Sequence, residues 1–201
     1  MGDENETDSA AVLPRLMETA ARLLDEAGEL EPVTVDLHLH SPGIQLKGGS
    51  FRSIAAARSA IDRIGEVLGV PPALKPVTGR IFSYQASGEW EGVPVHAMAL
   101  TPPGPNPFLT NPATRVTTTA QTAALLRSLA QWAAGLDTAR VRSLIVHEDK
   151  DGHHVQICVR NEQDQQGVAE AVIGHLPNKI EHHGSGHALL PTGHTLRIDT
   201  V

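Results

Sequence analysis

The chain has 201 residues, a formal net charge of −7 with histidine neutral, 40% hydrophobic and 19% charged residues. These values are ordinary for a soluble globular protein, and the length allows one domain or two small packed lobes. The acidic balance and the lack of a Lys/Arg block argue against nucleic acid as a partner, because nucleic-acid binding depends on neutralising phosphates.

Three sequence features predict a cytoplasmic protein without a membrane segment. A single cysteine, Cys158, excludes an intramolecular disulfide. The N-terminal sequence MGDENETDSA lacks the basic and apolar regions of a signal peptide, and no stretch approaches the roughly 18 apolar residues of a membrane span. Arginine outnumbers lysine 12 to 4, a composition typical of high-GC bacteria and their phages.

In the first half, an acidic segment over residues 1–10 is expected to be disordered, since it has nothing apolar to bury. A helix is predicted over 11–27, with Pro14 in its first turn and Gly28 at its end. A strand follows over 33–40, then a Gly-rich loop. A second helix begins after Ser50 or Ser53 and ends before Gly69. Strands over 80–87 and 93–100 form a hairpin around the five-residue loop Gly88–Gly92.

In the second half, Thr118 and Gln121 match a capping box that begins a helix over 119–134. Strands over 142–147 and 153–160 flank an Asp-Lys-Asp-Gly turn, and Asn161 caps the next helix. The remaining strands are expected over 179–183, 187–190 and 195–201.

The two halves share an order of helix, strand, helix, strand, strand, in which 33–40 corresponds to 153–160. This order predicts an α+β fold of two similar lobes, with a mainly antiparallel sheet and helices packed on one face. The predicted lobes are 11–100 and 117–201, joined by the Pro-rich linker 101–116. Whether the halves form one sheet or two is left open.

The segment Val33–His40 has two incompatible interpretations. Apolar Val33, Val35, Leu37 and Leu39 alternate with polar residues, which is typical of a strand with one face in the core and one in water. Alternatively, Asp36, His38 and His40 begin a zinc or other divalent-metal site, because alternate strand residues project from one face. We favour the architectural interpretation.

The sequence Asp36-Leu37-His38-Leu39-His40-Ser41 resembles the first motif of the polymerase and histidinol phosphatase family of metal-dependent phosphoesterases. The resemblance implies that His38 and His40 bind metal at the end of a barrel strand. It covers six residues. The family's Ser-Asp-Gly after the motif is replaced by Pro-Gly-Ile-Gln, and the strand–helix alternation of the barrel is missing.

Other histidines are the remaining candidates for chemistry. His182, His183, His187 and His194 lie in a Gly-rich stretch that is typical of an exposed loop with adventitious metal affinity. Cys158 lies between Ile157 and Val159, which favours a small half-buried residue over a nucleophile beside His147 or His154.

The favoured function is therefore a non-enzymatic protein-binding or assembly module, with another protein or a second copy of the chain as partner. Trp90, between two glutamates at a hairpin tip, is the candidate partner-binding anchor, or else it folds back onto the sheet. The sequence Ser87–Leu100 resembles proteins of actinobacteria and their phages, and this resemblance implies no activity. The alternative is a metal-dependent hydrolase that uses Asp36, His38 and His40 with some of His147, His153, His182, His183 and His187.

Overall fold

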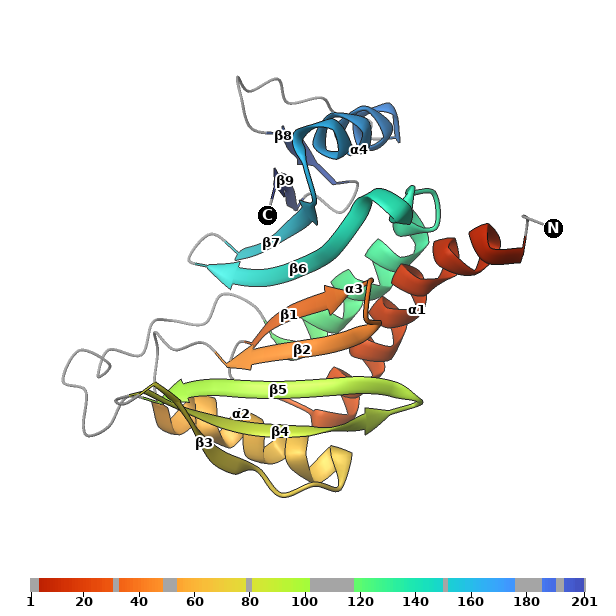
Figure 1. Cartoon of the computed structure of the whole chain (residues 1–201). Coiled ribbons are helices and arrows are strands. Elements are labelled where there is room, and N and C mark those ends of the chain that lie inside the picture. The colour runs from red at the N-terminus through yellow and green to blue at the C-terminus, as the bar shows by residue number, and fades with distance from the viewer. Residues whose placement is uncertain are drawn as a thin grey trace.

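A computed structural model describes residues 4–30, 33–48, 54–78, 81–101, 118–149, 152–175, 186–190 and 194–200. Within these residues, nine strands form one sheet against which four α-helices pack. Figure 1 shows α1, α2 and α3 behind the sheet, so the opposite face is turned towards the viewer. The structure has the α+β class that the sequence predicts. We call the sheet face opposite these helices the helix-free face.

The helices are α1 (Glu4–Ala27), α2 (Ile54–Leu68), α3 (Thr119–Ala133) and α4 (Glu162–His175), with a short 3₁₀ helix at Thr138–Arg140. The strands are β1 (Val33–His38), β2 (Gly43–Gly48), β3 (Ala73–Thr78), β4 (Ile81–Trp90), β5 (Val93–Thr101), β6 (Val141–Asp149), β7 (Gly152–Val159), β8 (Gly186–Leu189) and β9 (Thr195–Thr200).

The strand order is β3-β4-β5-β2-β1-β6-β7-β9-β8. The pairs β2·β5 and β7·β9 are parallel, and the other pairs are antiparallel. Strands of both halves thus share one sheet through the central pair β1·β6, and α1 packs on α3. The duplication of two lobes stays a prediction.

The strands at 33–40 and 153–160 were expected to hold equivalent places in the two halves, but they lie at different positions in the sheet. Strand β1 pairs across the centre with β6, whereas β7 occupies the next position outward, as β2 does on the other side. The error arises from the segment Gly43–Gly48, which was predicted to be a loop and is β2. The apolar–polar alternation from Ile44 to Lys47 spans only four residues, and the flanking Pro42, Gly43, Gly48 and Gly49 favoured a loop.

The core lies between the sheet and the helices. Helix α1 contributes Leu13, Leu16, Met17, Leu23 and Leu24, each at most 2% exposed, and packs against α3, where Leu126 and Leu129 are also buried. Gly28 ends α1 at a φ of 77°, and its N–H donates to the carbonyl of Leu24 at 3.1 Å. This left-handed position favours glycine, as the sequence predicts.

Helix α1 begins at Glu4, seven residues before its expected start and inside the predicted disordered tail. Pro14 therefore lies inside the helix rather than in its first turn. Pro14 removes one backbone N–H, and the neighbouring apolar positions Leu13, Leu16 and Met17 are nevertheless fully buried. Tertiary packing of this face outweighs the local cost of the proline.

The hairpin β4–β5 turns in two residues rather than five. Glu91 and Gly92 have φ values of 52° and 74°, the positive values that a tight hairpin turn requires. Trp90 and Val93 are paired residues of the ladder. The capping box of α3 is confirmed: Thr118 Oγ1 accepts from the N–H of Gln121 at 3.1 Å. The predicted linker falls, from 102 on, outside the described residues, as does the predicted strand 179–183.

Candidate binding surface

The three residues of the predicted metal motif have separate environments. Asp36 is only 4% exposed, although it lies on the face of β1 that was expected to be in water. Its Oδ2 atom accepts from Lys47 Nζ at 3.0 Å and lies 3.7 Å from His38 Nε2. Neighbouring side chains of the central strands thus enclose Asp36, so the expectation of a solvated face is wrong at Asp36, whereas the side chain of His38 on the same face is 45% exposed.

His40 lies beyond the end of β1 in a turn, where Arg160 Nε donates to its Nε2 atom at 2.9 Å. His38 is near Gln45, with 3.4 Å between Nε2 and Oε1. Across the described part of the chain, no group of three or more His, Cys, Asp or Glu side chains is placed to hold one metal ion. The metal assignment of Asp36, His38 and His40 stays a prediction.

The other histidines are divided between the two faces of the sheet. His147 and His154 are cross-strand partners whose rings stack at 5.5 Å between centroids. His153 instead faces the helices, where its Nε2 is 2.7 Å from Thr122 Oγ1 of α3. His182 and His183 lie outside the described residues. Of His187, only its backbone in β8, opposite Arg197, is described.

His194 lies with its ring centroid 5.8 Å from that of His153. Burial, and secondarily the nearby His154, lowers the pKa of His194. Cys158 is 4% exposed, and burial raises the pKa of its thiol. A raised pKa leaves the thiol protonated at neutral pH, as expected for a small buried residue rather than for a nucleophile.

Trp90 is partly buried and packs against the core at the hairpin end of β4. Its Nε1 is buried and has no hydrogen-bond partner among the described residues. The ring therefore folds back onto the protein, one of the two alternatives that the sequence left open. Its use as a partner-binding anchor stays a prediction.

Exposed apolar side chains are concentrated around Ile81, at the end of β4 opposite to Trp90, and on the neighbouring strands. The large hydrophobic side chains that are exposed among the described residues are Leu74 (51%), Val77 (54%), Ile81 (40%) and Leu100 (42%). All four lie on the adjacent strands β3, β4 and β5, and we call them the β3–β5 patch. Single exposed apolar residues are normal, whereas an exposed group on neighbouring strands is typical of an interaction surface.

The ladder registers assign the patch residues to faces. Ser83 is opposite both Leu100 and Lys75, and Ile81 is two residues from Ser83 on the same strand. Cross-strand partners share a face, and so do alternate residues of one strand. Ile81, Leu100 and Lys75 therefore lie together on the helix-free face. Leu74 is opposite Tyr84, on the helix side.

Helix α2 covers the helix side of this end but stops short of the sheet edge. It packs on β4 and β5, and Tyr84 OH donates to its Asp62 at 2.5 Å. All six residues of the edge strand β3 are exposed. The sequence missed β3 because Pro76 interrupts its apolar pattern. Proline is tolerated there because an edge strand has one side without a ladder partner.

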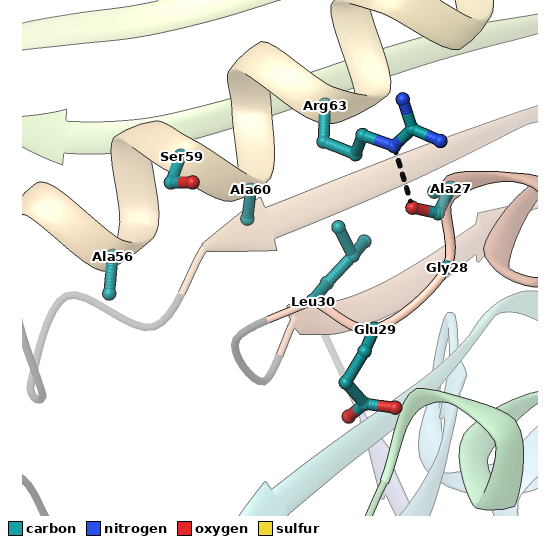
Figure 2. A pocket seen from close by; sticks show the side chains of 8 residues that line it. All are labelled: Ala27, Gly28, Glu29, Leu30, Ala56, Ser59, Ala60 and Arg63. Carbon is teal, nitrogen blue, oxygen red and sulfur yellow. Dashed lines mark hydrogen bonds between the residues drawn. The ribbon is translucent and has the colours of Figure 1, made fainter.

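A shallow pocket lies on the helix side, between the end of α1 and helix α2. Figure 2 shows Leu30 pointing into it, and Arg63 Nε donates to the carbonyl of Ala27 at 2.9 Å. Glu29 points away from α2 in the same view. Small residues of α2 form the opposite wall, among them Ala56, Ser59 and Ala60. The pocket thus combines a capped helix end with small apolar side chains and does not include the histidines or Asp36.

Comparison of the chain with protein-family models, curated proteins and solved structures finds no match. None of the described helices combines the length and the apolar character needed to cross a membrane.

Proposed function

We propose that the protein is a non-enzymatic binding or assembly module of the cytoplasm of a high-GC bacterium or its phage, and that a partner protein docks on the β3–β5 patch. The observation that carries the proposal is that Ile81 and Leu100, exposed on the helix-free face, lie beside the fully exposed edge strand β3, whose Leu74 and Val77 are exposed as well. Covering apolar surface is the main favourable term in most protein association.

The chemistry of β3 favours docking on the face of the sheet over addition of a strand at its edge. Pro76, in the middle of β3, has no N–H to offer an added strand. Ile81 and Leu100 project from the helix-free face, where no backbone pairing is needed for contact. A second copy of the chain is the other partner consistent with such a face, and the oligomeric state of the protein distinguishes it.

The test is affinity capture from a lysate of the source organism. Leu100→Asp places a charge in the patch, and Ala120→Asp, at an exposed position in the first turn of α3, is the control with the same charge change. We expect the wild type and Ala120→Asp to retain the same protein and Leu100→Asp to lose it. If the wild type, Ala120→Asp and Leu100→Asp all retained the same proteins, docking on the patch would be refuted.

The alternative proposal is a metal-dependent hydrolase. It is supported by the 3.7 Å approach of His38 Nε2 to Asp36 Oδ2 on β1. The ion pair of Lys47 with the same oxygen, and the contact of Arg160 with His40, must both be broken before these groups bind a metal. Stoichiometric metal in tag-free protein that disappears in His38→Ala/His40→Ala would favour the hydrolase and count against the binding module.

A further inference from the structure

The charge around the β3–β5 patch points to the chemistry of its partner. Lys75 is the only Asp, Glu, Lys or Arg in the segments 73–78, 81–88 and 93–100. It lies on the helix-free face, in one cross-strand row with Ser83 and Leu100. On the helix-free face, Ile81 and Leu100 therefore have Lys75 as the one Asp, Glu, Lys or Arg side chain of these three segments.

The ammonium of Lys75 has no carboxylate partner among the described residues. By contrast, Lys47, on the same face, pairs with the buried Asp36 at 3.0 Å. The positive charge of Lys75 also acts on its surroundings, because it contributes, after burial, to lowering the pKa of His96 on β5. The sequence places a second cation, Arg80, between β3 and β4.

Complementary interfaces set apolar surface against apolar surface and oppose unlike charges at the rim. Resting on the docking proposed above, we infer that the partner is a protein segment that carries aliphatic side chains together with at least one carboxylate. The aliphatic side chains cover Ile81 and Leu100, and the carboxylate pairs with Lys75. A basic segment is disfavoured, because it would bring a like charge towards the same lysine.

The test is selection of random 12-residue peptides displayed on phage against the full chain at low salt. Enriched peptides are then synthesised, and their affinities are measured for the wild type, Lys75→Gln, Leu100→Asp and Ala120→Asp. Circular dichroism confirms that each variant is folded, and Ile81→Asp replaces Leu100→Asp if the latter is not.

We expect enriched peptides to combine aliphatic residues with Asp or Glu and to lose binding to Leu100→Asp. Lys75→Gln should weaken binding by about two- to fivefold, the upper part of the range for a solvent-exposed ion pair. Binding to Ala120→Asp should be unchanged.

Other results separate the two levels of the proposal. Neutral or basic peptides that depend on Leu100 would overturn the carboxylate inference and leave the docking surface intact. No enrichment, or enrichment that is indifferent to Leu100→Asp, would overturn both. A concentration-dependent dimer that is lost in Leu100→Asp would replace the partner segment with a second copy. Binding of the chain to anionic phospholipid vesicles that is lost in Leu100→Asp would replace the partner segment with a membrane surface.

Discussion

Replacing Lys47 should destabilise the protein because the buried carboxylate of Asp36 would lose its only lysine or arginine partner among the described residues. The side chain of Asp36 is 6% exposed, that of Lys47 is 43% exposed, and Nζ lies 3.0 Å from Oδ2. Breaking a fully buried pair costs about 3–5 kcal/mol, whereas a surface pair contributes about 0–1 kcal/mol. The exposure of Lys47 places the cost of Lys47→Met between these limits, at about 1–3 kcal/mol.

Asp36 Oδ1 is also buried and has no hydrogen-bond partner among the described residues, so the loss of Lys47 would leave the carboxylate with the 3.7 Å approach of His38 Nε2 to Oδ2. Asp36→Asn removes the charge that requires Lys47. In the double variant Asp36→Asn/Lys47→Met, the cost of losing the lysine should therefore fall, with a coupling free energy of about 1–2 kcal/mol.

The assay is urea unfolding followed by far-ultraviolet circular dichroism, with Lys75→Met as the matched control. Lys75 is an exposed lysine of the same sheet face without a carboxylate partner among the described residues, and its replacement should change the free energy of unfolding by less than about 0.5 kcal/mol. The reasoning is refuted if Lys47→Met costs no more than Lys75→Met, or if the coupling is near zero.

Two further predictions concern the helices and the histidines. Gly65→Ala should destabilise the protein, because a Cβ there would lie 2.7 Å from the carbonyl oxygen of Val70. Gly167→Ala in α4 meets only the flexible guanidinium of Arg140 and should be neutral or stabilising by up to about 1 kcal/mol. Thermal unfolding of both variants checks the contrast, and equal shifts of the melting temperature would contradict it. The lowered pKa of His194 means that folding favours its neutral form, so its contribution is complete above the unfolded pKa of about 6.5 and is lost as the pH falls below that value. Urea midpoints at pH 7.5 and 5.5 should therefore differ less in His194→Gln than in the wild type, and an unchanged difference would argue against this role.

The apolar alternation of Val33–Leu39 correctly predicted a strand with a buried face at Val33, Val35 and Leu37. It did not predict the burial of Asp36, because that depends on β1 being a central strand between β2 and β6. The pairing with β6 joins residues more than a hundred positions apart, and local periodicity carries no information on such partners. Turn and capping chemistry was predictable where it is local, as at Gly28 and Thr118.

The β3–β5 patch could not be predicted for a related reason. Pro76 interrupts the apolar pattern of the edge strand β3, so local periodicity does not assign Leu74 and Val77 to a strand. Exposure of Ile81 and Leu100 depends on where α2 and the neighbouring strands end, which is set by tertiary packing. The alternation of β4 and β5 alone does not show which apolar residues a helix covers.

The most direct test of docking on the β3–β5 patch is mapping of a selected acidic peptide by amide chemical-shift changes in the isotopically labelled full chain. The account predicts that the largest changes lie in β3 (Ala73–Thr78) and in the adjoining ends of β4 and β5 around Ile81 and Leu100. Changes centred on the pocket between α1 and α2, or spread without preference over the sheet, would contradict it.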